Sequence, residues 1–163
     1  MKFTVGNKVS YPSQGPCLIG PVVKKVVSGS PKSFYPLTLL DGSGGELFIP
    51  VERVEAIGMR QLLEKSDIPK LLGRLRKRSG TAVNWKQRTL DNLRLLASGS
   101  PFDLAEVVES LTALNETRTL TPRDRQTLDR ARKLLVCEIA EVTGETKLAA
   151  EERLDEALKK AER

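Results

Sequence analysis

The side chains best suited to chemistry in this sequence are a group of cations around one tryptophan. Trp85 is the only tryptophan among the 163 residues, and seven basic residues lie within eleven positions of it. They are Arg74, Arg76, Lys77, Arg78, Lys86, Arg88 and Arg94. Cations of this kind bind phosphates and displace condensed counterions, and a flat ring can stack on a base or wedge beside it. The cluster therefore predicts a nucleic-acid groove.

The distribution of charge along the chain points to the same segment. The chain has 27 Lys and Arg against 21 Asp and Glu, which gives a net charge of +6. Residues 1–57 contribute +2, residues 58–94 contribute +7, and residues 95–163 contribute −3. The middle segment therefore holds more than the whole excess. An excess of this size permits binding to nucleic acid but does not establish it.

Both features also have simpler explanations. Basic runs are commonly solvated helix faces, and a single tryptophan commonly lies in a core. On a helical wheel that starts at Asn84, the core face is centred on Leu90, Leu93 and Ala97, and Trp85 falls near its border. Periodicity alone therefore leaves the burial of Trp85 open.

Catalytic chemistry has little support in the residue types. The sequence contains no His, which removes most Ser-His, Cys-His and His-metal arrangements. Cys17 and Cys137 match no metal-site spacing, and we expect both to be buried; a hydrolase would need one of them as its nucleophile. The acidic pairs at 151–152 and 155–156 fall on a charged helix, where adjacent side chains diverge. We predict a protein that is not an enzyme and that has no metal site and no cofactor.

The sequence also lacks the signals of a membrane protein. The first fifteen residues contain no long apolar stretch, and no segment approaches the about 18 apolar residues that a membrane span requires. With two widely separated cysteines, the chain is expected to be cytoplasmic, in a reducing compartment.

The first third of the chain has the pattern of short strands. Apolar and β-branched runs fall at residues 8–11, 17–19, 22–23, 34–40 and 46–50, with Gly- and Pro-containing turns between them. We predict a small β-barrel or sandwich over residues 1–57.

Residues 58–163 have a helical period instead. Ser100-Pro101 and Thr121-Pro122 are predicted helix starts, with the Ser and Thr as capping residues. Other helices are predicted over 68–77 and 84–97, and an amphipathic tail over 146–161 that is either docked or frayed. Two predicted apolar stripes are Leu104, Val107, Val108, Leu111 and Leu114, and Leu128, Ala131, Leu135, Ile139 and Val142. The predicted fold is α+β, with a small β domain (1–57) followed by an all-helical domain (58–163).

Several motifs occur in an informative order. They are Phe3-x-Val5-Gly6-x-x-Val9-x-Tyr11-Pro12-x-x-Gly15, Phe48-Ile49-Pro50, Asn84-Trp85-x-x-Arg88-x-x-x-Asn92-Leu93-x-x-Leu96-Ala97-Ser98-Gly99, and Ala105-Glu106-Val107-Val108-x-x-Leu111. Over residues 1–142 this pattern resembles the bacterial CarD family of transcription regulators. The resemblance implies an SH3-like, Tudor-like domain that binds the β subunit of RNA polymerase, akin to the polymerase-interacting module of the transcription-repair coupling factor. It also implies a helical domain that contacts promoter DNA.

The resemblance further implies a mechanism. A tryptophan at the upstream fork of the transcription bubble wedges into the minor groove and stabilises the open promoter complex without strong sequence specificity, and one monomer acts in each complex. On this chain the wedge is Trp85, in a helix capped by Asn84, with Lys86 and Arg88 as the nearest phosphate contacts. The remaining DNA-binding candidates are Lys77 and Arg78.

The polymerase contact is expected on the β domain. Its candidates are Lys25 and the edge strand Glu46, Leu47, Phe48 and Ile49, which can pair with a strand of the partner. Phe48 and Ile49 are equally compatible with a barrel core. The sequence departs from the family pattern at Gln14, where a His is common, and at Phe48, where a cation is common. The alternative function is an SH3-like adaptor whose helical half binds a protein.

Overall fold

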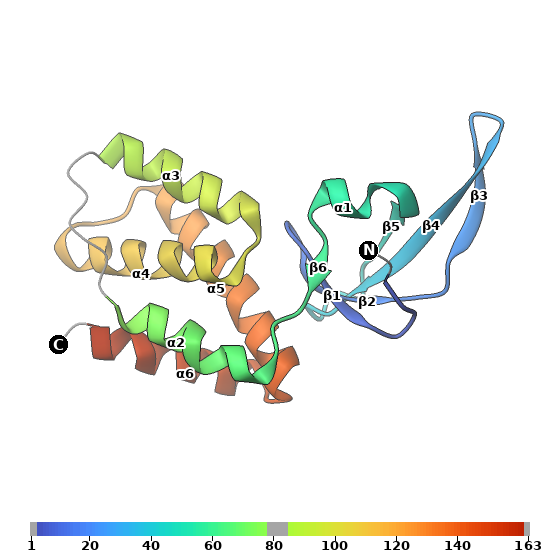
Figure 1. The fold of residues 1–163 in the computed structure, drawn as a ribbon. Helices are drawn as coiled ribbons and strands as arrows, with labels where there is room; N and C mark the ends of the chain where they lie inside the picture. Colours follow the sequence, from blue (N-terminus) through green and yellow to red (C-terminus); the bar gives the residue numbers. More distant parts are fainter. Residues whose placement is uncertain (1–2, 78–84, 162–163) are drawn as a thin grey trace. The chain divides into compact units, whose positions relative to one another are not determined.

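The chain divides into two compact units, residues 1–62 and 63–163, each with its own hydrophobic core (Figure 1). The computed structural model describes residues 3–77 and 85–161, with the side chains of residues 3–77 and 86–160. An antiparallel sheet of six strands makes up most of the first unit, and helices make up the second. The predicted α+β class is therefore confirmed.

The first unit is built on β-hairpins. Its elements are β1 (Lys8–Tyr11), β2 (Gly15–Ile19), β3 (Val23–Val27), β4 (Ser30–Leu39), β5 (Glu46–Pro50), a 3-10 turn (Val51–Arg53), α1 (Val54–Ile57) and β6 (Arg60–Gln61). The strand order is β3-β4-β2-β1-β6, and β5 pairs with β4. Because β6 pairs with Val9 and Ser10 of β1, the first unit extends to Leu62, beyond the predicted boundary at residue 57.

The hairpin of β3 and β4 is longer than the sequence pattern predicted. Ser28 and Gly29 have φ values of 52° and 80°, so the connection is a two-residue turn with both residues left-handed. Residues 30 and 31, which the pattern put in a loop, are instead the first residues of β4. The loop predicted at residues 28–31 is therefore at the right place but two residues too long, because a serine supplies one of the two positive φ angles of the short turn.

The core of the first unit encloses one of the two cysteines. Cys17 is fully buried with Val9, Leu37 and Ile49. Burial and the nearby Asp41 carboxylate raise the pKa of the Cys17 thiol to about 11. The thiol is therefore protonated near neutral pH, which is unfavourable for a nucleophile.

The second unit packs five helices around an aliphatic core. They are α2 (Ile68–Arg76), α3 (Trp85–Ser98), α4 (Pro101–Thr117), α5 (Pro122–Thr143) and α6 (Lys147–Ala161), after a 3-10 turn (Lys65–Asp67). The two predicted stripes of α4 and α5 do face this core. The tail helix α6 is docked on α2 and α5, with Leu154 fully buried and Arg132 ion-paired to Glu151 and Asp155 at 3.2 and 2.5 Å.

One of the two predicted helix caps is correct. The Thr121 hydroxyl accepts a hydrogen bond from the Asp124 amide at 3.2 Å, as predicted. The Ser100 side chain does not cap α4, although its backbone is extended as at a cap. Instead the Ser98 hydroxyl accepts from the Ser100 amide at 3.2 Å and lies 2.7 Å from a carboxylate oxygen of Asp103. Ser100 is therefore the N-cap residue by position, and the Ser98 hydroxyl, which donates to Asp103, links the end of α3 to the first turn of α4 without capping it.

The predicted core face of α3 is wrong. Leu90 is 55% exposed and Ala97 is also exposed, whereas Leu95 and Leu96 pack against the core and Asn92 is buried. The inward face is therefore partly polar, which an apolar wheel cannot identify.

Candidate functional site

The predicted DNA-binding residues lie at the end of α2 and the beginning of α3. Lys77 is exposed just after α2, and Lys86 is exposed in the first turn of α3. Trp85 begins α3, but its side chain lies outside the described residues, as do Arg78 and Asn84. The described candidates are thus brought to the two helix ends that flank residues 78–84.

Arg88 differs from the other candidates because it faces an acid of its own unit. Its guanidinium Nη2 is 3.7 Å from one carboxylate oxygen of Glu106 in α4, and its side chain is only 21% exposed. The other oxygen of Glu106 accepts from Arg74 Nη2 of α2 at 3.2 Å. A further contact joins Arg74 Nη1 to the buried Glu109 at 4.0 Å. Two cations of the +7 segment are therefore engaged inside the helical unit.

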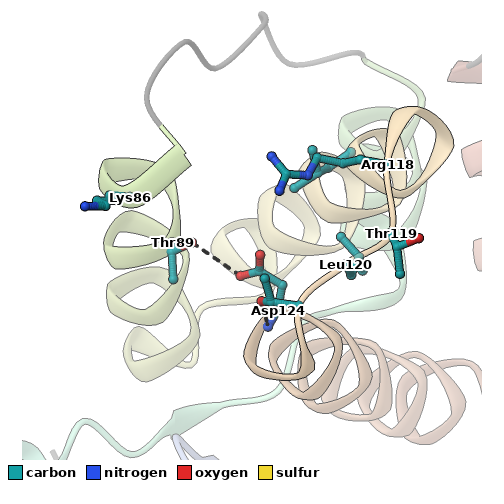
Figure 2. Close-up of a pocket in the computed structure, with 8 residues that line it drawn as sticks. Lys86, Thr89, Arg118, Thr119, Leu120 and Asp124 are labelled. Carbon is teal, nitrogen blue, oxygen red and sulfur yellow. Dashed lines mark hydrogen bonds between the residues drawn. The ribbon is translucent and has the colours of Figure 1, made fainter.

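A cavity of about 190 Å³ opens beside the first half of α3. Its described lining is Lys86, Thr89, Leu114, Arg118, Thr119, Leu120, Thr121 and Asp124. Figure 2 shows Arg118 extending toward α3 and the amine of Lys86 directed away from the cavity. The Thr89 hydroxyl donates to Asp124 Oδ1 at 3.4 Å, which joins α3 to the first turn of α5.

Sequence reasoning missed Arg118. The residue is exposed and lies in a segment whose summed charge is negative, so the count by segment concealed a cation that lines the same cavity as Lys86. The predicted helix start at Thr121 could have indicated it. Arg118 lies in the short connection before that start, and such a connection has to approach a neighbouring helix.

The predicted polymerase-binding residues lie on β5 and β3. Along β5, Glu46 and Phe48 are exposed, Leu47 is intermediate and Ile49 is buried in the core. The Lys25 ammonium of β3 lies 3.8 Å from the centroid of the Phe48 ring, a cation–π contact. Phe48 and Lys25 thus form one surface element, whereas Ile49 can contribute to an interface only through its backbone.

An apolar surface on β3 was also missed. Val26 is 74% exposed and Val27 is 41% exposed, in the same strand as Lys25. The sequence signal was present in two adjacent β-branched residues at the tip of a hairpin. Because successive side chains of a strand point to opposite faces, the two valines expose apolar area on both faces of the hairpin. Exposed apolar area is common on protein-binding surfaces.

No group of three or more Cys, Asp or Glu side chains in residues 3–77 and 85–161 is arranged to hold a metal ion. None of the described helices combines the length and apolar composition that a membrane span requires.

The fold and these surfaces are those of a binding protein made of two units. Comparison with known families identifies the class of binding protein. Residues 3–63 match the CarD-like/TRCF RID domain, and residues 70–155 match the CarD C-terminal domain. Such domains define RNA polymerase-interacting regulators of transcription, a non-catalytic class, in which the RID domain is Tudor-like. The chain belongs to the CarD family.

Proposed function

We propose that this chain binds the β subunit of RNA polymerase through residues 1–62 and stabilises the open promoter complex through its helical unit. One copy acts at the upstream fork of the bubble, where Trp85 wedges into the minor groove. The observation that supports this most directly is the position of Trp85 at the first residue of α3, with Lys86 beside it and Arg118 across the adjacent cavity.

The phosphate contacts follow from exposure and charge. Lys86, Arg118 and Lys77 are exposed cations, and exposed cations can approach a DNA backbone. The proposed DNA-binding set also contains Asn84, which the family resemblance assigns as the cap of α3, and Arg78, which belongs to the basic cluster around Trp85. Because a fork differs from a duplex in shape and deformability, the site needs no readout of base sequence.

A wedge at the fork favours the melted state for a simple reason. Reclosure of the duplex has to expel the ring and lose stacking of about 1–3 kcal/mol per base. A free energy of about 1.4 kcal/mol already shifts an equilibrium tenfold, so one side chain is sufficient for a measurable effect.

The polymerase contact is proposed on β5 and β3. The exposed edge of β5 can add a strand from the partner, because β4 is its pairing strand within the described sheet. Phe48 and Lys25 then supply an apolar and a charged contact beside that backbone pairing. Binding to polymerase concentrates a weak DNA contact at the promoter.

The lifetime of the open promoter complex tests the proposal. Trp85→Ala should shorten it about tenfold, because stacking of the ring is lost. Leu90→Ala is the matched control, because it also removes an apolar side chain from α3. Leu90 is 55% exposed, and its loss should leave the lifetime unchanged. An unchanged lifetime in a folded Trp85→Ala protein would contradict the wedge and favour the adaptor function.

A further inference from the structure

We infer that Arg88 is a positioning residue: its ion pair with Glu106, together with the Thr89–Asp124 hydrogen bond, fixes the end of α3 that carries Trp85. This inference rests on the proposed function. It assigns Arg88 a role inside the helical unit in place of a phosphate contact.

The two halves of α3 are attached to the unit by different interactions. The second half packs through Leu95 and Leu96 against the aliphatic core. The described part of the first half has an exposed Leu90 and is joined to its neighbours by polar contacts at Arg88 and Thr89. Apolar packing is non-directional, whereas ion pairs and hydrogen bonds depend on geometry. Among the described side chains of the first half, the polar contacts of Arg88 and Thr89 are therefore the ones that we take to specify the position of the first turn.

The contacts of Arg88 and Thr89 are made with different helices. Arg88 reaches Glu106 of α4, and the adjacent Thr89 reaches Asp124 of α5. Glu106 also accepts from Arg74, so a single carboxylate joins α2, α3 and α4. Since α2 and α3 flank residues 78–84, this carboxylate sets the spacing between the ends of that segment.

The geometry of Arg88 argues against a phosphate contact. Its Nη2 is buried and has no hydrogen-bond partner within the described part of the chain. The same holds for the Nδ2 atom of Asn92, one turn later in α3. To reach DNA, Arg88 would have to leave Glu106 and expose this atom. A buried polar group without a hydrogen bond costs stability, so the pair of Arg88 with Glu106 is better suited to fixing one helix position than to stabilising the fold.

Glu106→Gln separates the two roles because they predict effects of opposite sign. If Arg88 positions α3, loss of the carboxylate should shorten the open-complex lifetime roughly three- to tenfold, since a geometry-defining ion pair is broken. If Arg88 contacts a phosphate, removal of the competing acid should strengthen DNA binding and lengthen the lifetime. Glu152→Gln removes a negative charge from an exposed site on α6 and controls for the general change in charge.

The salt dependence of binding to forked DNA gives an independent readout. Each lost phosphate contact makes the negative slope of log affinity against log salt concentration shallower by about 0.9. Lys86→Gln should show this decrease, whereas Arg88→Gln should lower affinity with the slope unchanged. The double variant Arg88→Gln with Glu106→Gln should be no weaker than Glu106→Gln alone, because Glu106→Gln already removes the contact with Arg88.

Fluorescence anisotropy of the sole tryptophan tests the positioning role without DNA. Arg88→Gln and Glu106→Gln should both lower it, because the first turn of α3 is less constrained. Circular dichroism melting checks that both variants are folded. Unchanged anisotropy, a longer lifetime for Glu106→Gln, or a smaller salt slope for Arg88→Gln would each overturn the inference. An unaltered lifetime for Trp85→Ala would instead contradict the proposed function alone.

Discussion

The two units expose different kinds of surface. Six of the nine large apolar side chains that are exposed among the described residues belong to the first unit, which has about a third of the chain. They are Val5, Leu18, Val22, Val26, Val27 and Phe48. The helical unit instead exposes cations at the beginning of α3 and before α5, at Lys86 and Arg118.

Because the exposed surfaces differ, the affinities of the two proposed contacts should depend differently on salt concentration. Burial of apolar side chains and strand addition depend weakly on ionic strength, whereas phosphate contacts weaken steeply with salt. The polymerase contact should therefore persist at salt concentrations that abolish the DNA contact.

The largest expected effect concerns stability. Leu154→Ala removes a fully buried side chain from the helical core and should lower the free energy of unfolding of that unit by about 3–5 kcal/mol. Both tyrosines, Tyr11 and Tyr35, lie in the first unit and the sole tryptophan lies in the second. Thermal unfolding followed by Trp emission should shift, whereas the Tyr absorbance transition should not. A joint shift would show that the units do not unfold independently.

Loss of the first unit should have the next largest effect. A chain limited to residues 63–163 should bind forked DNA with the same salt slope as the full chain. It should need at least about a hundredfold higher concentration to prolong the open complex, because attachment to polymerase no longer raises its local concentration. Titration of both proteins in an open-complex lifetime assay measures the difference. Equal activity of the two proteins would refute the division of roles.

A smaller effect is expected at the surface of the sheet. Phe48→Ser should weaken binding to the polymerase β subunit about tenfold, by loss of an exposed aromatic ring and its contact with Lys25. The affinity should change little with salt. Leu148→Ser alters a side chain that is 68% exposed in the helical unit and serves as the control, with polymerase affinity expected to be unchanged.

The structural features that were predictable from the sequence are those specified by neighbouring residues in the chain. The start of α5 was predicted because Thr121 and Pro122 suffice to define it. The orientation of β5 was also within reach, since alternation puts Leu47 and Ile49 on one face and Glu46 and Phe48 on the other. The register of β5 with β4, which pairs Ile49 with Tyr35, identifies the inner face.

The parts that were not predictable depend on partners distant in the sequence. The ion pair of Arg88 with Glu106 joins two helices, so a charge count by segment placed the arginine on a free basic patch. The same seam gives α3 a polar inner face at Asn92, whose Oδ1 accepts from Ser110 at 3.4 Å. The helical wheel of apolar residues therefore placed Leu90 on the core face, although Leu90 is exposed. Polar contacts between helices carry no periodic signal.

The smallest expected effect tests which cations of α3 contact DNA. Lys86→Gln should lower the affinity for forked DNA about threefold near physiological salt and reduce the salt slope by about 0.9, because one phosphate contact is lost. Arg94→Gln removes the same charge from the same helix, but Arg94 lies two turns further on, 76% exposed and 3.6 Å from Asp91. We expect its affinity and slope to match those of the unaltered chain, as measured by fluorescence titration at several salt concentrations. Equal losses for both variants would mean that the whole outer face of α3 attracts DNA through net charge, and that the beginning of the helix has no special role.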